Sequence, residues 1–162
     1  MKINRYQPHV FVLPKDDADR QLANGFLLDP FLLAHKIQVL VPGEGWMKVL
    51  ECFKSDHVRE METCPHRLMV LLIDFDRDED RLNRARAVIP DHLVDRVFVL
   101  GTWRNPEKLK ASLGRPLEAI GMELAKDCRE EAYTTWGHEL LKHNASEIGR
   151  LRERVRPFLF QL

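Results

Sequence analysis

Six apolar residues in a row, 68–73, lead directly into "DFD", so two carboxylates stand where the run ends. Asp74 and Asp76 are two residues apart, and in an extended chain their side chains point to the same side. Two such carboxylates repel each other unless a cation or an arginine lies between them. Mg²⁺ meets this need, because it prefers oxygen ligands and binds one or two carboxylates together with waters and substrate phosphates. The spacing therefore makes Asp74 and Asp76 candidate magnesium ligands.

A second interpretation of the same segment needs no metal. Acidic residues after a strand often cap the next helix, and the run from Asp78 to Asp80 suits the positive end of that helix. Nearby arginines could neutralise the acids by salt bridges or bind a phosphate of a nucleic acid. These arginines are Arg77, Arg81 and Arg84. Capping explains Asp78 and Asp80 better than Asp74, which still lies in the strand register.

Strand-like and helix-like segments alternate along the chain up to Leu100, and helical spacing alone follows. The predicted strands are residues 7–13, 37–41, 69–73 and 96–100. The predicted helices are residues 16–28, 46–53, 79–88, 106–113, 116–129 and 136–156. Because each parallel crossover needs a connection of helix length, the alternation predicts a four-stranded, mainly parallel α/β sheet with helices on both faces. We expect one domain over residues 1–162, with an alternating core in 1–101 and a helical extension in 102–162.

The predicted sheet also brings the candidate residues together in space. Ligands of parallel sheets bind at the carboxyl ends of the strands. The first strand is followed by "PKDD" and the third by "DFD", so both acidic segments emerge at this edge. We therefore expect Asp16 or Asp17 to lie near Asp74 and Asp76 and to supply a further carboxylate.

The β-α-β-α-β-α-β order with Asp-x-Asp closing the third strand resembles the Toprim domain. That domain is found in type IA and type II topoisomerases, DnaG-type primases, OLD-family nucleases and small RNases. In the family the Asp-x-Asp pair helps to bind Mg²⁺, and a glutamate after the first strand acts as general acid/base or as a further ligand. The resemblance covers about the first hundred residues and assigns Asp74 and Asp76 of "LLIDFD" to the pair. The glutamate is missing from "VFVLPKDDADR", where Asp16 and Asp17 are the nearest acids.

Two functions follow from this resemblance. The favoured one is a Mg²⁺-dependent phosphodiester enzyme, a nuclease, in which Asp74 and Asp76 hold the metal and Asp16 or Asp17 is the catalytic carboxylate. The metal would polarise the phosphate and lower the pKa of an attacking water. Because the glutamate is missing, the alternative is a Toprim-like domain without catalytic activity that serves as a binding or regulatory protein. Such a protein would act through a protein partner or as a homodimer.

Composition limits the partners and the compartment. The 25 lysines and arginines equal the 25 aspartates and glutamates, so no whole-molecule field attracts nucleic acid or anionic lipid. Binding of DNA or RNA must then come from local basic patches, such as the arginine-rich segment 150–156. No apolar run approaches the ~20 residues that span a bilayer, and no signal peptide is expected. Three cysteines, an odd number, favour a reduced, cytoplasmic protein. Because no run of spanning length occurs, no membrane partner is expected.

One further cluster, "CFKSDHVREMETCPH", contains four residues of the types that bind zinc. Structural zinc sites usually pair their ligands in tight Cys-x₂₋₄-Cys and His-x₃₋₅-His units, and this spacing fits neither well. A buried thiol with exposed histidines is the favoured interpretation.

Overall fold

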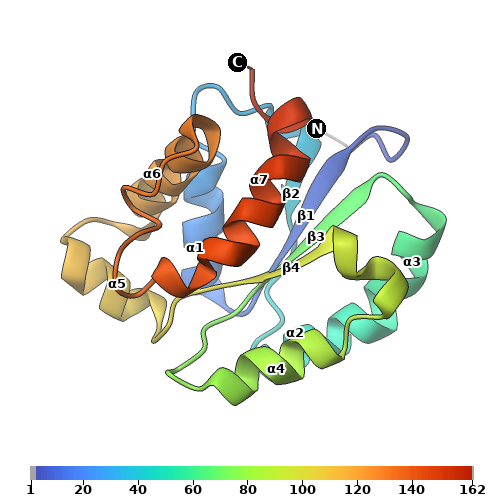
Figure 1. The fold of residues 1–162 in the computed structure, drawn as a ribbon, viewed down its shortest axis with the longest axis horizontal. Helices are drawn as coiled ribbons and strands as arrows, with labels where there is room; N and C mark the ends of the chain where they lie inside the picture. Colours follow the sequence, from blue (N-terminus) through green and yellow to red (C-terminus); the bar gives the residue numbers. More distant parts are fainter. Residues whose placement is uncertain (1–2, 162) are drawn as a thin grey trace.

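The computed structural model describes residues 3–161, which contain a four-stranded sheet of order β2-β1-β3-β4 (Figure 1). All three strand pairs are parallel, which confirms the predicted α/β sheet and makes it wholly parallel. The strands are β1 (His9–Pro14), β2 (Ile37–Val39), β3 (Arg67–Leu72) and β4 (Val97–Leu100). Their bounds depart from the predicted ones by at most two residues at either end.

Helices cover both faces of the sheet, as the alternation predicts (Figure 1). One face carries α1 (Asp17–Phe26), α5 (Pro106–Leu113), α6 (Leu117–Glu130) and α7 (Ala145–Leu159). The other face carries α2 (Trp46–Cys52), α3 (Val58–Thr63) and α4 (Glu79–Ala87). A π-helical turn, η2 (Phe53–His57), joins α2 to α3, so the predicted helix 46–53 continues to residue 63. Short 3₁₀ turns are η1 (Ala34–Lys36), η3 (Asp91–Arg96) and η4 (Lys142–Asn144).

The apolar run of β3 reflects its central place in the sheet. Leu68, Val70 and Leu72 belong to the core beneath α1, α6 and α7. Met69 and Leu71 belong to the core on the opposite face. Side chains of a strand alternate between the two faces, so a strand that is covered on both sides shows no polar alternation.

Close packing against α6 fixes the position of α1. A Cβ atom at Gly25 would collide with the backbone of Glu118, and one at Gly121 would collide with the backbone of Leu22. Only glycine permits the two helix backbones to approach so closely. This contact holds α1, which begins at the carboxyl end of β1, firmly on the sheet.

The free edge of β4 is covered by α7. The backbone N–H of Val99 donates to Glu147 Oε2 at 2.8 Å, and that of Gly101 donates to Asn144 Oδ1 at 3.2 Å. These two side chains occupy the hydrogen-bonding positions that a fifth strand would take, which protects the edge from pairing with another chain.

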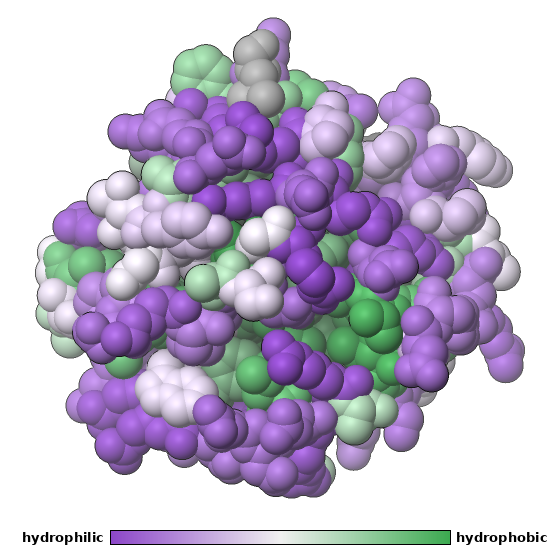
Figure 2. Space-filling view, in the orientation of Figure 1, coloured by the Kyte–Doolittle hydropathy of each residue, from purple (hydrophilic) through white to green (hydrophobic). Residues whose placement is uncertain are grey.

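The surface agrees with a chain that carries 31% charged residues. Hydrophilic side chains dominate the face drawn in Figure 2, and apolar residues emerge between them in patches. None of the helices in residues 3–161 is long and apolar enough to cross a membrane.

Candidate active site at the carboxyl edge of the sheet

The order β2-β1-β3-β4 creates a switch point between β1 and β3, because the chain leaves these neighbours in opposite directions. In open parallel sheets, the crevice outside such a point is the usual place for a ligand. Pro14 of β1 pairs with Leu72 of β3, and the N–H of Lys15 donates to the carbonyl of Leu72 at 2.9 Å. The pairing thus brings Lys15 and Asp16 beside the residues that follow β3.

Asp74 lies between two cations at this edge. The Lys15 ammonium is 2.6 Å from Asp16 Oδ2 and 3.6 Å from Asp74 Oδ1, so the two aspartates share it. From the other side, Arg81 Nη1 contacts Asp74 Oδ1 at 3.2 Å and the Asp74 carbonyl at 3.0 Å. Burial nevertheless raises the pKa of Asp74, because it outweighs the opposing charges of Lys15 and Arg81.

Asp19, in the first turns of α1, is the most unusual group of the site. It is 0% exposed, and neither of its carboxyl oxygens has a hydrogen-bond partner among residues 3–161. Burial raises the pKa of Asp19 well above its ordinary value, and the charge of Asp16 raises it further. The charges of Asp74 and Glu107 act in the same direction, whereas Lys15 opposes them. Asp19 therefore shares one electrostatic environment with Lys15, Asp16 and Asp74.

Sequence reasoning missed Asp19, although the sequence holds a signal for it. Asp16 is the N-cap of α1 and accepts a hydrogen bond from the Asp19 N–H at 3.1 Å. Counted along the helix, Asp19 precedes Leu22 and Ala23 by three and four residues, so it lies on their buried face. An acid on the apolar stripe of an amphipathic helix is the pattern that identifies it.

The other candidate carboxylates are exposed. Asp17 lies on the outer side of α1, where Arg20 and Gln21 hydrogen-bond to it, and the bond from Arg20 lowers its pKa. Asp76 is exposed in the turn after β3, with a left-handed φ of +46°, and Arg77 follows with a φ of +59°. The prediction that an extended backbone places the side chains of Asp74 and Asp76 on the same side is therefore wrong, because the chain turns at Asp76. The structure gathers Asp16 and Asp74 around Lys15, but it leaves Asp17 and Asp76 in exposed positions.

The capping interpretation is correct for Asp78, which is the N-cap of α4 and accepts from the Asp80 N–H at 2.9 Å. Of the three candidate arginines, Arg81 pairs with Asp74 and also lies over the Trp46 ring, 4.7 Å from its centroid. Exposed Arg84 lies over the same ring at 5.1 Å. Arg77 is exposed, and its backbone N–H donates to the Trp103 carbonyl.

Three aspartates and two basic residues make this site negative in net charge when all are ionised. Within residues 3–161, no three His, Cys, Asp or Glu side chains form a ready-made group for a metal ion. At the carboxyl edge the Lys15 ammonium stands between Asp16 and Asp74. The cysteine and histidine cluster gathers no such group either: Cys64 is buried with its thiol directed to the Arg5 carbonyl, and His66 is exposed.

The arginines of α7 fasten that helix to the rest of the chain. Arg150 donates to the carbonyls of Val94 and Val97, Arg154 to that of Asp95, and Arg156 to that of Arg129. Arg152 donates to the Ala132 carbonyl and lies over the Tyr133 ring. These contacts give the arginine-rich segment a structural role.

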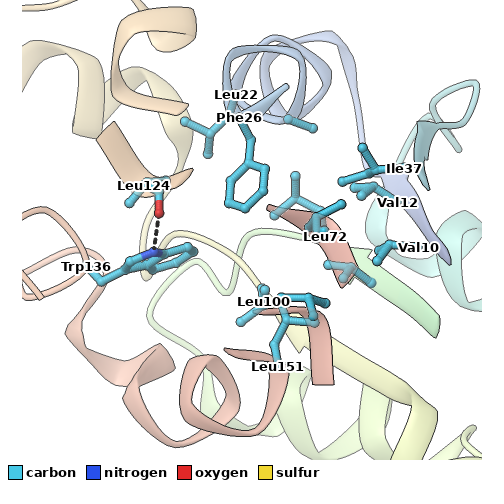
Figure 3. Close-up of a pocket in the computed structure, with 14 residues that line it drawn as sticks. Val10, Val12, Leu22, Phe26, Ile37, Leu72, Leu100, Leu124, Trp136 and Leu151 are labelled. Atoms are coloured by element: carbon cyan, nitrogen blue, oxygen red, sulfur yellow. Dashed lines mark hydrogen bonds between the residues drawn. The ribbon is translucent and has the colours of Figure 1, made fainter. Parts of the chain in front are cut away.

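An apolar cavity of about 70 Å³ lies between the sheet and α1, α6 and α7 (Figure 3). Phe26, Leu72, Leu100 and Trp136 surround it, and Trp136 Nε1 is bonded to the Leu124 carbonyl at 3.1 Å. Among the described residues, such a cavity offers apolar contacts and no polar group for catalysis.

Comparison of the chain with protein-family models, with curated proteins and with solved structures found no match in any of the three. The resemblance to the Toprim domain therefore stays a prediction.

Proposed function

We propose that the carboxyl edge of β1 and β3 is the active site of a Mg²⁺-dependent phosphodiester enzyme, Toprim-like in type and acting on nucleic acid. Asp16, Asp19 and Asp74 would hold the metal. The observation that carries this proposal is the buried Asp19 carboxyl, which meets no donor from residues 3–161 and whose pKa is raised by burial and by the charges of Asp16, Asp74 and Glu107.

Asp16 and Asp74 lie around one cation, the Lys15 ammonium, and carboxylate oxygens are the ligands that a hard divalent cation prefers. A buried polar group left without a partner costs roughly 1–3 kcal/mol, and native proteins leave few of them. An ion with oxygen ligands would relieve this cost at Asp19, and would also relieve the repulsion among Asp16, Asp19 and Asp74. When bound, Mg²⁺ would polarise a phosphate ester and lower the pKa of an attacking water.

The chain itself supplies the other parts of such a site. Lys15 and Arg81 are cations at the same edge and would contact phosphate oxygens of the substrate. Arg81 also fixes Asp74, because it bonds to both the carboxylate and the carbonyl of that residue. Both Arg81 and Arg84 lie over the Trp46 ring, which holds the two guanidinium groups next to each other.

Metal binding and cleavage test this proposal together. Thermal melts in EDTA and in Mg²⁺ should show a stabilising shift in the wild-type protein, because the ion binds the folded state. Asp19→Asn and Asp74→Asn should each abolish the shift and also abolish cleavage of single- and double-stranded DNA and RNA oligonucleotides. Asp17→Asn, on the exposed side of the same helix, is the matched control and should keep both. A wild-type protein with neither a Mg²⁺-dependent shift nor cleavage would end the proposal.

A second candidate function is a Toprim-like binding or regulatory protein without catalysis. The observation that favours it is Lys15, which already neutralises Asp16 and Asp74 without a metal. This function is supported if oligonucleotide binding survives in EDTA and is unchanged in Asp19→Asn, while Lys15→Met weakens it.

A further inference from the structure

The backbone of Lys15 is fixed by hydrogen bonds, whereas its ammonium is held only by ion pairs. Its N–H donates to the Leu72 carbonyl at 2.9 Å, and its carbonyl accepts from the Gly45 N–H at 3.1 Å. The backbone of Lys15 is therefore fixed between neighbouring segments at the sheet edge. Its side chain, 16% exposed, extends through a flexible four-carbon stem to an ammonium that lies between Asp16 and Asp74.

We infer that Lys15 is a built-in counter-ion, which fills the cation position of this site until a divalent ion replaces it. This inference rests on the proposed function, because it concerns the same three carboxylates. The ammonium lies 2.6 Å from Asp16 Oδ2 and 3.6 Å from Asp74 Oδ1, so it partly neutralises both carboxylates.

Two cations cannot share this position, because an ammonium and a divalent ion repel each other at such short range. Binding of the ion must therefore displace the Lys15 side chain from Asp16 and Asp74. The backbone stays in place, so the released ammonium remains at the crevice, where it can contact a substrate phosphate. Lys15 thus weakens metal binding in the free protein and becomes available to the substrate once the metal is bound.

The inference predicts that removal of a positive charge from Lys15 tightens metal binding. Lys15→Met keeps most of the length of the apolar stem and removes the ammonium. Its affinity for Mn²⁺, measured by the electron paramagnetic resonance signal of the free ion, should exceed that of the wild type by roughly tenfold or more. In EDTA the same variant should melt at a lower temperature, since the carboxylates then repel each other without a counter-ion. Lys48→Met, an exposed lysine of α2, is the matched control and should change neither quantity.

Each outcome decides between the inference and the proposed function. Tighter binding in Lys15→Met than in a wild type that also binds Mn²⁺ supports both. Binding in Lys15→Met alone supports the counter-ion role and overturns the metal-dependent function of the wild type. Equal affinities overturn the counter-ion role and leave the function standing, and binding in neither protein overturns both. If Lys15→Met fails to fold, Lys15→Gln gives the same comparison. Addition of Asp19→Asn to either variant should abolish the gain, which places the ion in this cluster.

Discussion

Three buried carboxylates of this protein differ in the partners that they meet. Asp127 on α6 accepts hydrogen bonds from the backbone N–H groups of Thr135 and Trp136, at 2.6 and 3.0 Å. Glu147 on α7 accepts from the edge strand β4 and from an arginine of its own helix. Asp19 on α1 is as deeply buried, but it receives no hydrogen bond from the described chain.

The difference separates a structural use of buried charge from a functional one. Asp127 and Glu147 each satisfy backbone donors that would otherwise be buried unpaired, so the fold gains from their burial. Asp19 satisfies no donor and lies near other acids, so the fold gains nothing comparable from it. A raised pKa caused by burial and by a like charge is typical of functional sites.

The largest effect is expected at Asp127. Asp127→Ala leaves the N–H groups of Thr135 and Trp136 without their acceptor, in a segment where both residues are buried. The free energy of unfolding should fall by about 3 kcal/mol, since hydrogen bonds to a charged group are among the stronger ones. Urea denaturation measures this loss. Glu130→Ala, at the exposed end of the same helix, is the control, and an equal loss there would contradict the structural role of Asp127.

A smaller loss is expected at Glu147, which serves a single backbone donor. Glu147→Ala frees the N–H of Val99 on the edge strand and should lower the free energy of unfolding by about 2 kcal/mol. Glu147→Gln keeps an acceptor oxygen and should recover about half of that loss. The two variants are compared by urea denaturation. An equal loss in Glu147→Ala and Glu147→Gln would show that the Val99 N–H does not depend on the Glu147 acceptor.

The sequence predicts most of the fold because the relevant signals are local. The apolar run before Asp74 identifies a strand that is covered on both faces, and Asp16 and Asp78 both cap the helices that follow strands. The carboxyl-edge rule then brings Asp16 to Asp74 without any knowledge of side-chain contacts. The positions of Asp16, Asp74 and Asp78 depend only on the order of the strands and on where the helices begin.

What the sequence does not predict depends on long-range contacts or on unusual backbone. Helical spacing predicts a helix over residues 136–156, but the chain forms turns after Trp136 and α7 begins only at Ala145. The reason is that Asp127 of α6 accepts hydrogen bonds from the N–H groups of Thr135 and Trp136. Left-handed backbone at Asp76, a non-glycine residue, breaks the strand alternation that the Asp-x-Asp pattern assumes. The role of Lys15 depends on the distance between two strand ends, which a single segment cannot reveal.

Asp74 lies between the two kinds of buried acid, because it is at the proposed site but has Lys15 and Arg81 as partners. Substitution of Arg81 tests how far the fold depends on this pairing. Arg81→Gln removes the cation from Asp74 and weakens the bond to the Asp74 carbonyl. The free energy of unfolding in EDTA should fall by about 1 kcal/mol, because Lys15 still neutralises Asp74. Arg84→Gln, which loses only its exposed contact with Trp46, should cost less in the same urea titration. A larger loss for Arg84 than for Arg81 would show that Asp74 does not depend on its arginine.

Asp19 should give the smallest effect on stability at neutral pH and the clearest effect on its pH dependence. The pKa of Asp19 is raised in the folded protein above the ~3.9 of an unfolded aspartate. Between these two pKa values the folded state binds more protons than the unfolded state. The contribution of Asp19 to the free energy of unfolding is therefore fully present below the unfolded pKa, and it is lost as the pH rises through the folded pKa. Asp19→Asn cannot titrate. The stability of the wild type relative to this variant should therefore fall as the pH rises from about 4 towards neutrality.

Asp17, on the same helix, should show a pH dependence of stability opposite in sign to that of Asp19, and Asp17→Asn tests this. The hydrogen bond from Arg20 lowers the pKa of Asp17, so its contribution is present above the unfolded pKa and is lost as the pH falls. Urea titrations of the wild type and both variants, in EDTA from about pH 3 to neutrality, should therefore give two difference curves of opposite slope, that of Asp17→Asn changing around and below pH 4 and that of Asp19→Asn above it. A flat curve for Asp19→Asn would mean that its carboxyl ionises as easily as in the unfolded chain. The contrast with Asp127 would then disappear, and with it the main reason to place function at this edge of the sheet.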